Sequence, residues 1–367
     1  MSLLTCDFLV IGAGMAGLSA AAHLSSHGST LVLEQEEHPG YHATGRSAAI
    51  FVDSYGVGPI RTLTSHSRRL FESGSLPGLD LGLLTPRGLL YVTFDDDLHP
   101  VFADLDYLPR LSPAEVVALA PILKRERVCG AFYEATALDM DVHGMQTAYL
   151  RHLRRQGGTL ITGAGVHAAR RLGGVWQVET KEGSVQAPII VNAAGAWAGT
   201  VAGLFGAADP GLVPKRRSAA IIDGPAGADV TGWPMVADMA GRFYFKPEGG
   251  KLMLSPAEAE PTPPSDAYAD DMQIAIAADH FQTVTGLDVT RVQRNWAGLR
   301  TFAPDEQPVI GFDPTVPGLF WLAGQGGFGI QTAPAAAALT AALVTGTDAG
   351  FEVAGWLPSV SPARFGG

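Results

Sequence analysis

Cysteine is nearly absent from this chain of 367 residues, which contains only Cys6 and Cys129. Two cysteines cannot build a disulfide framework or a four-cysteine zinc site, and such sparing use is typical of a reducing cytoplasm. Basic charge is also scarce, with 25 lysine and arginine residues against 36 acidic residues and a formal net charge of −11. This balance disfavours a nucleic-acid partner, which would require a basic surface.

Long hydrophobic runs and a targeting segment are missing as well. No apolar run reaches the roughly 20 residues of a membrane span, and the run at 335–344 suits only a buried helix. The N-terminus lacks the basic region of a signal peptide, so its apolar stretch is interpreted as a first strand. We therefore expect a cytoplasmic protein without a transmembrane segment, and peripheral contact with the inner face of the membrane stays compatible with that expectation.

Glycine, by contrast, is abundant at 45 residues, and two glycine-rich turns lie near opposite ends of the chain. The first, residues 12–17, follows an apolar run at 8–11 and precedes an alanine-rich stretch at 18–24. Strand, tight turn and helix in this order are typical of a dinucleotide-binding unit. The next strand ends in Glu34, at the distance expected for an acid that binds a ribose hydroxyl, and no arginine follows it for the 2′-phosphate of NADP.

The second turn, residues 324–329, follows a buried strand expected at 319–323. If a helix begins at 326–328, its free N–H groups converge on one point and would stabilise an anionic reduced flavin. Between the two turns, the loop 40–49 carries small residues, two hydroxyls and Arg46. These residue types suit a backbone that passes close to a pyrophosphate and a ribityl chain.

The elements between the turns alternate between nucleotide-binding and β-rich character. Strands are expected at 89–93, 159–161, 175–180, 189–191, 217–222, 242–246, 251–254 and 289–295, and helices at 60–71, 143–156, from 196, at 266–283 and from about 330; a capping box at Ser112 and Glu115 starts a short helix. This interleaving disfavours an NAD dehydrogenase and favours a flavoprotein. The predicted fold class is α/β: a Rossmann-like FAD-binding domain (1–80, 143–206 and 305–367) interleaved with an α+β substrate-binding domain built on a β-sheet (81–142 and 207–304).

Two arginines lie in sequence surroundings that suit a carboxylate site. Arg300 ends the otherwise uncharged segment 295–299, and Arg217 lies in the basic segment 215–217. A planar guanidinium matches a carboxylate with two parallel hydrogen bonds, and a pair of them fixes orientation as well as charge. From the residues alone, a structural ion pair for Arg300 and a surface position for Arg217 stay open.

With these residues in hand, the chain resembles the D-amino-acid oxidase superfamily of flavoproteins, and within it the bacterial D-arginine dehydrogenases and related D-amino-acid dehydrogenases. The similarity runs nearly end to end and includes 40–49, 214–219, 243–247, 254–257, 296–300 and 325–332. The resemblance implies non-covalent FAD, Arg217 and Arg300 near the substrate carboxylate, and Tyr55 and Tyr244 as hydroxyl-bearing walls. The segment 49–58 resembles a mobile lid hinged at Gly56 and Gly58.

The motifs and the resemblance together give a set of expected site residues. Those expected to bind the cofactor are Gly12, Gly14, Met15, Ala16, Gly17, Glu34, Gln35, Thr44, Gly45, Arg46, Ser47, Ala48, Ala49, Val166, Ala194, Gly195, Trp197, Arg300, Gly326, Gly327, Phe328, Gly329, Ile330, Gln331 and Thr332. The substrate pocket would contain Ile50 and Leu89, with Gly327 and Gln331 beside the flavin ring or the substrate amine. No metal ion is expected.

Two departures from the arginine-specific relatives bear on specificity. Leu89 stands where such a relative has a glutamate, and Ile50 stands where it has a histidine. Loss of a buried acid and gain of aliphatic surface favour an apolar or aromatic D-amino acid over D-arginine. Asp53, or the acidic run 95–97, could supply a replacement charge from another position.

The resulting hypothesis is oxidative deamination of D-amino acids to 2-oxo acids and ammonia, by hydride transfer from the α-carbon to flavin N5. No side-chain base is evident, and His42 and His143 are interpreted as structural. The expected partners are a small amino-acid substrate and an electron acceptor (a quinone, a redox protein or O2), in a monomer or homodimer. One alternative is a secondary-amine oxidase of the sarcosine, N-methyl amino acid or glycine type, disfavoured because no cysteine after Cys129 could attach FAD covalently. Another is a non-catalytic FAD-binding subunit.

Overall fold

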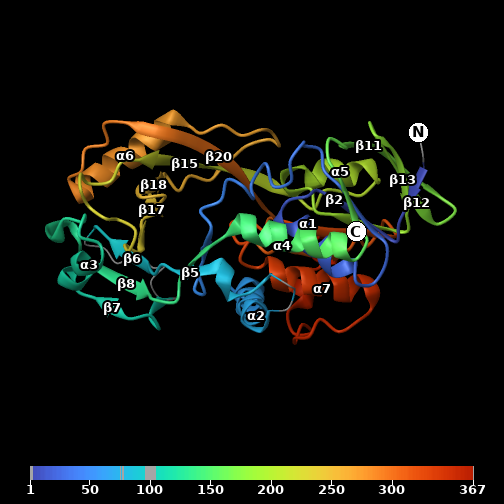
Figure 1. Cartoon of the computed structure of the whole chain (residues 1–367), viewed down its shortest axis with the longest axis horizontal. Coiled ribbons are helices and arrows are strands. Elements are labelled where there is room, and N and C mark those ends of the chain that lie inside the picture. Colours follow the sequence, from blue (N-terminus) through green and yellow to red (C-terminus); the bar gives the residue numbers. More distant parts are fainter. Residues whose placement is uncertain (1–2, 75, 77, 96–104, 367) are drawn as a thin grey trace.

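A six-stranded sheet forms the core of one half of the molecule (Figure 1). The computed structural model describes residues 3–74, 76, 78–95 and 105–366. In spatial order, the sheet contains β10 (Thr159–Ile161), β3 (Thr30–Leu33), β2 (Phe8–Ile11), β14 (Ile189–Asn192), β22 (Leu319–Ala323) and β21 (Val309–Phe312). All neighbours are parallel except β21. Its central strands are short and apolar because helices or a second sheet cover both faces.

One face of this sheet is covered by helices and the other by a smaller sheet. The helices are α1 (Met15–Leu24), α2 (Pro59–Ser73), α4 (Val142–Arg155) and α7 (Ala333–Thr345), which share one hydrophobic cluster with the sheet. The alanines of α1 and α7 let the two helix backbones approach closely. The second cluster joins the other face to α5 (Ala198–Leu204) and to the sheet β1 (Leu3–Thr5), β13 (Gly183–Ala187), β12 (Val175–Thr180) and β11 (Val166–Leu172).

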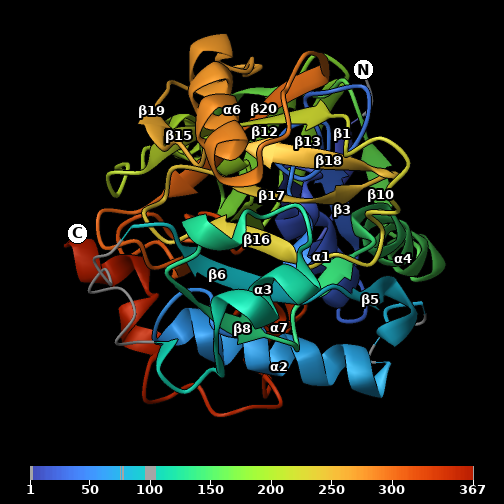
Figure 2. The same ribbon diagram turned by 90° about the vertical axis from the view of Figure 1, so that its left-hand side faces the viewer.

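A nine-stranded sheet forms the core of the other half. In Figure 2 this half of the molecule faces the viewer. Its order is β19 (Glu260–Pro261), β15 (Val213–Ile222), β18 (Lys251–Ser255), β17 (Tyr244–Glu248), β16 (Met235–Asp238), β6 (Leu89–Thr93), β8 (Gly130–Glu134) and β7 (Arg110–Leu111), with β20 (Val292–Phe302) paired to β15. The long β15 and β20 run from this half toward the six-stranded sheet (Figure 1). A third sheet has the spatial order β4 (Ile50–Phe51), β9 (Leu138–Met140) and β5 (Leu84–Pro86).

Alternation along the strands gives the nine-stranded sheet two different faces. On one face, Leu90, Phe245 and Leu254 pack with α3 (Pro113–Leu119) and α6 (Asp271–Thr285). The neighbouring residues point to the opposite face, where Leu89, Tyr244 and Met253 form a separate cluster. That second face looks toward the six-stranded half, and the chemistry described below lies on it.

Several predicted elements have the predicted bounds, and others begin or end at different residues, such as β15, which starts at Val213 and not at 217, and β17, which covers Tyr244–Glu248 and not 242–246. The strands at 89–93, 159–161, 175–180 and 319–323 have the predicted bounds, and the Ser112–Glu115 capping box starts α3. The helix predicted at 266–283 begins only at Asp271, because the side chain of Asp270 caps the N–H groups of Met272 and Gln273. The strand predicted at 289–295 is instead β20, which pairs with β15 as far as Phe302. The helix predicted from about 330 begins at Ala333, so the earlier start considered at 326–328 is wrong.

Short 3₁₀ turns complete the described chain at Leu81–Leu83, Arg125–Arg127, Gly195–Trp197, Leu357–Ser359 and Pro362–Phe365. The mixed α/β fold class, with a nucleotide-type sheet interleaved with a second β-rich half, is confirmed. The exact division into 1–80, 143–206 and 305–367 against 81–142 and 207–304 stays a prediction. None of the helices in the described ranges is both long enough and apolar enough to traverse a lipid bilayer.

Candidate active site

The N-terminal glycine turn has the geometry of a dinucleotide cradle. Gly12 has φ +102°, and a Cβ atom there would lie 2.6 Å from the carbonyl oxygen of Ala193. A Cβ at Gly17 would lie 1.8 Å from the carbonyl oxygen of Gly12, so only glycine lets α1 start this close to β2. Among the described residues, none accepts a hydrogen bond from the N–H groups of Ala16 and Gly17. These free donors at a helix N-terminus are available to an anion.

Glu34 and Thr44 hold the two sides of this cradle. The Oε2 atom of Glu34 accepts a hydrogen bond from the N–H of Ala13 at 2.6 Å, and its Oε1 atom accepts from the N–H of Glu36 at 3.0 Å. The hydroxyl of Thr44 accepts from the N–H of Met15 at 2.9 Å. Glu34 thus lies at the end of β3 with both carboxylate oxygens fixed by backbone N–H groups, and its contact with a ribose hydroxyl stays a prediction.

The C-terminal glycine turn also presents free backbone donors, although no helix begins there. The N–H groups of Gly326 and Phe328 bind the carbonyls of Thr301 and Gln325. Within the described part of the chain, the N–H groups of Gly327, Gly329 and Ile330 have no acceptor. The predicted convergence of donors is therefore supplied by an open turn before α7, without the helix dipole that we expected directly behind it.

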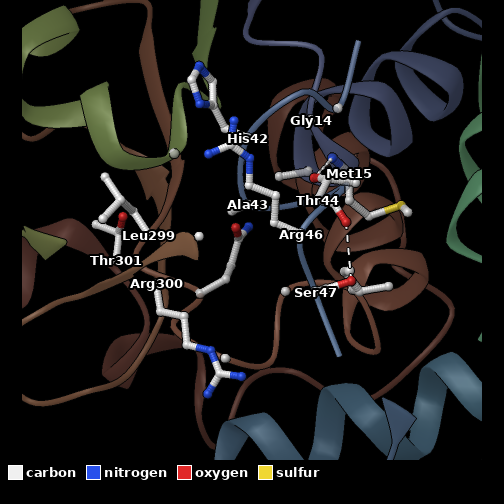
Figure 3. A pocket seen from close by; sticks show the side chains of 18 of the residues that line it. Gly14, Met15, His42, Ala43, Thr44, Arg46, Ser47, Leu299, Arg300 and Thr301 are labelled. Carbon is white, nitrogen blue, oxygen red and sulfur yellow. Dashed lines mark hydrogen bonds between the residues drawn. The ribbon is translucent and has the colours of Figure 1, made fainter. Parts of the chain in front are cut away.

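Both turns line one cavity of about 430 Å³ that runs from the six-stranded sheet to the nine-stranded sheet. Figure 3 shows Met15, Thr44 and Ser47 on one side of it and the β20 residues Leu299, Arg300 and Thr301 on the other. Predicted residues that line the cavity are Gly12, Gly14, Met15, Ala16, Glu34, Gln35, Thr44, Arg46, Ser47, Ala48, Ala49, Ile50, Tyr55, Leu89, Val166, Ala194, Gly195, Trp197, Arg217, Tyr244, Arg300, Gly326, Gly327, Gly329, Ile330 and Gln331. Gly17, Gly45, Phe328 and Thr332 are predicted site residues that lie outside its lining.

Arg217 and Arg300 meet at the far end of this cavity because their strands are paired. Arg217 faces Gly298 across the β15–β20 pair, so Arg300 is its diagonal neighbour on the same face. The Nε atom of Arg217 donates to the carbonyl of Glu258 at 2.6 Å, and Nη1 of Arg300 lies 3.5 Å from the hydroxyl of Tyr55. Burial and the positive charge of Arg300 lower the pKa of Arg217. The carboxylate of Glu258 offsets part of the charge on Arg300. The two neighbouring cations in one pocket still attract an anion.

Tyr55 and Tyr244 complete the cationic end. Burial alone would raise the pKa of Tyr244, but the guanidiniums of Arg300 and Arg217 outweigh it, and the net shift is downward. For Arg300, burial acts to lower the pKa, whereas Tyr55, Tyr244 and Glu258 raise it and prevail. Tyr55 packs on Phe328 with ring centroids 4.4 Å apart, and it is 37% exposed, so the lid segment that carries it borders both the cavity and solvent.

The remaining walls at this end are apolar. Ile50, Leu89, Met235 and Met253 line the cavity beside Arg217, and within the described lining the sole carboxylate is Glu34 at the opposite end. Neither proposed replacement acid reaches the pocket: Asp53 pairs with Arg68 at 2.7 Å, and Asp95 pairs with Arg242 at 3.0 Å. Asp96 and Asp97 lie outside the described residues. The described walls therefore offer a carboxylate site next to an aliphatic surface.

Two predicted site residues bind other parts of the protein. The side-chain amide of Gln331 binds both the N–H and the carbonyl of Val52 and the hydroxyl of Thr64, so it holds the segment 49–58 in place. Gln331 also lines the cavity, and its position beside the flavin ring or the substrate amine stays a prediction. The guanidinium of Arg46 binds the carbonyls of Ala267 and Ala297 and pairs with Asp266 at 2.5 Å. Arg46 therefore ties its loop to the other half, and its hydrogen-bonding capacity is largely used within the protein.

The histidines agree with their structural interpretation. His42 borders the cavity, but its Nε2 atom contacts Glu36 at 2.8 Å and its ring packs on Trp197. His143 is exposed near the start of α4. No group of metal-ligating side chains occurs among the described residues.

Sequence reasoning missed several residues of the substrate end. Tyr91, Met140, Met235, Ala237 and Met253 line the cavity. Tyr91 could have been found, because it lies two positions after Leu89 in a strand and therefore shares its face. The methionines and Ala237 belong to strands that the sequence does not place beside one another.

Comparisons with known proteins agree with this geometry. A family model described as FAD dependent oxidoreductase (DAO) matches residues 7–343. Human sarcosine dehydrogenase, a mitochondrial protein, is 27% identical over 390 residues, covering 98% of this chain and 40% of that protein. Rat dimethylglycine dehydrogenase is 24% identical, covering 88% of this chain and 41% of its own length. The chain thus spans about two fifths of the length of these relatives.

Solved structures share the fold over nearly the whole chain. L-proline dehydrogenase from P. horikoshii has a TM-score of 0.84 at 22% identity, covering 99% of this chain and 98% of that one. Glycine oxidase from Geobacillus kaustophilus has a TM-score of 0.81 at 21% identity, covering 96% and 98%. At these identities the likeness establishes the fold alone.

Proposed function

The chain belongs to the FAD dependent oxidoreductase (DAO) family, and we propose that it oxidises the α-carbon–nitrogen bond of apolar or aromatic D-amino acids. The main supporting observation is one cavity that joins two glycine turns with free N–H groups to a pair of neighbouring guanidiniums beside an aliphatic wall. The glycine turns fit the pyrophosphate and ring of FAD, Glu34 fits its ribose, and the guanidiniums fit a substrate carboxylate.

The chain's residues supply binding and orientation. Arg217 and Arg300 grip the carboxylate, and the hydroxyls of Tyr55 and Tyr244 lie beside it. With the carboxylate fixed, the α-carbon is directed toward Gly327, and the side chain of the amino acid is directed toward Ile50, Leu89 and Met253. FAD, when bound, accepts the two electrons that leave the α-carbon–nitrogen unit as a hydride. Water then hydrolyses the imine product to a 2-oxo acid and ammonia.

The free N–H groups of the C-terminal turn have an electrostatic role in this proposal. Gly327, Gly329 and Ile330 present donors to the cavity without a competing acceptor among the described residues. Fixed backbone donors stabilise negative charge without reorganising at the moment of reaction. They would therefore favour the reduced, anionic form of the cofactor ring.

We further propose that FAD is held non-covalently. Cys6 and Cys129 are both absent from the lining of the cavity. Acid precipitation of the yellow protein should release all flavin into the supernatant, and a yellow pellet would contradict this part of the proposal.

Anaerobic mixing with a panel of amines tests the proposed activity directly. D-leucine, D-phenylalanine and D-methionine should bleach the yellow protein, and D-arginine should do so with a much lower kcat/KM, because a guanidinium would be buried without a partner. The L-enantiomers serve as matched controls. A clear advantage for D-arginine, or equal bleaching by L-amino acids, would contradict the proposed specificity.

A second candidate activity is oxidation of a secondary amine such as sarcosine. It is favoured by the sequence similarity to sarcosine and dimethylglycine dehydrogenases over nearly the whole chain. Both activities use the same carboxylate grip, so the panel should include sarcosine, N-methyl amino acids and glycine. Faster bleaching by sarcosine than by any D-amino acid would select this activity.

A further inference from the structure

A buried hydrogen-bonded chain leads from the candidate substrate pocket to a carboxylate that binding does not use. Glu134, at the end of β8, is 2% exposed. Its Oε1 atom accepts from the N–H groups of Asp53 at 2.7 Å and Ser54 at 3.2 Å, and its Oε2 atom accepts from the hydroxyl of Ser54. The hydroxyl of Ser54 lies 2.8 Å from that of Tyr91, and Tyr91 lines the cavity.

The protons of this chain have a defined direction when Glu134 is ionised. A carboxylate only accepts hydrogen bonds, so Ser54 must donate its single hydroxyl proton to Glu134. Ser54 can then only accept from Tyr91, which donates its own proton away from the pocket. The lone pairs of the Tyr91 oxygen are left for a donor on the cavity side.

We propose that the substrate ammonium loses its proton along this chain, from Tyr91 through Ser54 to Glu134. The inference rests on the proposed function, in which an amino acid must be oxidised as its neutral amine. Tyr91 would touch the substrate as a catalytic residue, whereas Ser54 and Glu134 act through it as positioning residues.

The transfer balances without any other reactant. The ammonium N–H bond breaks as its proton binds the Tyr91 oxygen, the former Tyr91 proton moves to Ser54, and the former Ser54 proton moves to Glu134. Tyr91 and Ser54 end with one proton each, Glu134 becomes a neutral carboxylic acid, and the amine keeps its lone pair. This step is a proton transfer without oxidation or reduction.

The surroundings of Glu134 suit a proton acceptor. Burial is the main cause that raises its pKa, opposed by the hydrogen bonds from Ser54 and Asp53, and the charge of Asp53 raises it further. Asp53 is itself paired with Arg68. The other titratable groups that face the chain are Tyr55 and Tyr107, which act on Tyr91, and Arg61, which acts on Tyr107. Tyr107 also interacts with Ser54 and with the charge of Glu134. No cation among these groups contacts Glu134 itself, so gaining a proton breaks no ion pair of this carboxylate.

The pH dependence of the reductive half-reaction tests the path in the FAD-loaded enzyme. E134Q keeps the size of the side chain and an oxygen for the two backbone N–H groups, but it cannot take the proton. We expect kcat/KM at pH 7 for the amine that best bleaches the wild-type protein to fall by roughly 10²-fold. The deficit should shrink as the pH rises toward the pKa of the free amine, because neutral substrate then arrives from solution.

Two further variants separate proton transfer from support of the lid. Y91F removes the first hydroxyl but leaves the bonds from Glu134 to Asp53 and Ser54, and it should show the same alkaline recovery. E126Q changes an exposed glutamate on a distant 3₁₀ turn and should leave the profile unchanged. A wild-type profile in either E134Q or Y91F would overturn the path and leave the amine oxidation standing. If no amine bleaches the wild-type protein, both proposals fall.

Infrared difference spectroscopy gives a readout that does not depend on turnover. The probe is 2-aminoisobutyrate, which carries a carboxylate and an ammonium but has no hydrogen on the α-carbon to be oxidised. Its binding to the wild-type holoenzyme should produce the carbonyl stretch of a protonated carboxyl, and this band should be missing in E134Q. Binding without that band in the wild type would overturn the proposal.

Discussion

The two ends of the cavity are built by different means. At the cofactor end most of the functional groups are backbone atoms, namely the free N–H groups of Ala16 and Gly17 and those of the open turn at 327–330, and Glu34 adds one carboxylate. At the substrate end they are side chains, namely two guanidiniums, two tyrosine hydroxyls and an aliphatic wall. The cofactor end thus requires an absence of side chains, and the substrate end requires particular ones.

This difference determines which substitutions each end tolerates. A backbone site is destroyed by any added Cβ atom that collides with a neighbouring carbonyl, whatever its chemistry. A side-chain site keeps its shape when one residue is changed but loses the interaction that this residue supplied. Substitutions at the cofactor end should therefore abolish flavin binding, whereas substitutions at the substrate end should slow turnover and leave flavin bound.

The largest effect is expected from Gly17→Ala. Its Cβ would lie 1.8 Å from the carbonyl oxygen of Gly12, and neither backbone can yield without opening the contact between α1 and β2. We expect the variant to purify without flavin and to unfold at a lower Tm. Gly203→Ala is the matched control, because nothing lies within 4 Å of a Cβ at that helical glycine. Retention of stoichiometric flavin by Gly17→Ala would contradict the backbone account of this end.

The cofactor end could be predicted from local sequence, because strand, turn, helix and acid follow one another within 8–34. Only the start of the second helix was misplaced: the turn at 326–332 is held by bonds to Thr301 and Gln325 that come from another strand and from within the turn itself. The interval between a glycine motif and its helix is set by such contacts, and the spacing of glycines does not reveal them.

The substrate end could not be predicted from residue types alone. Arg217 and Arg300 become neighbours through the β15–β20 register, which joins residues about 80 positions apart. The resemblance to a family predicted that both arginines lie near one carboxylate. The register of β15 and β20 explains why the two side chains are neighbours. Glu134 was missed for the same cause, since it reaches Ser54 only through the pairing of β8 with β6 and the fold of the lid.

Arg300→Ala should produce the next largest effect and leave the other end intact. Removing one of two guanidiniums from a buried carboxylate site costs about 2–5 kcal/mol, which corresponds to a rate lower by roughly 30-fold to 5,000-fold. We expect the reductive half-reaction to slow by at least this factor while FAD stays bound. Arg300→Lys, which keeps the charge without the planar fork, should recover only part of the rate. Loss of FAD from Arg300→Ala would instead assign this arginine to the cofactor end.

Gly327→Ala should have an intermediate effect, because this glycine belongs to both ends. An added Cβ would lie 2.8 Å from the hydroxyl of Tyr55 and 3.1 Å from Nη1 of Arg300, so these two side chains must move aside. Displacement of positioning groups by about 1 Å can cost roughly 10²-fold in rate. Stopped-flow reduction should show that loss with normal flavin content, and an unchanged rate would show that the turn does not set the position of Arg300.

The smallest effect concerns stability at the cofactor end. Burial lowers the pKa of His23 on α1 from 6.5 to about 4, and the charges of His152 and His27 add to this shift. Its Nε2 atom is buried without a partner among the described residues. Between these two pKa values the unfolded chain binds the proton and the folded chain does not. The free energy of unfolding should therefore fall as the pH drops from 7 to 5, by roughly 2 kcal/mol from this group.

Denaturant titrations at pH 7 and pH 5 measure that contribution. In His23→Gln the part of the pH dependence due to this residue disappears, so the variant should lose less stability on acidification than the wild-type protein. His143→Gln changes an exposed histidine near the start of α4 and should behave as the wild type. Equal pH dependence of stability in His23→Gln and wild type would contradict this prediction. It would mean that α1, which follows the first glycine turn, accommodates the charged imidazole of His23 in the folded protein.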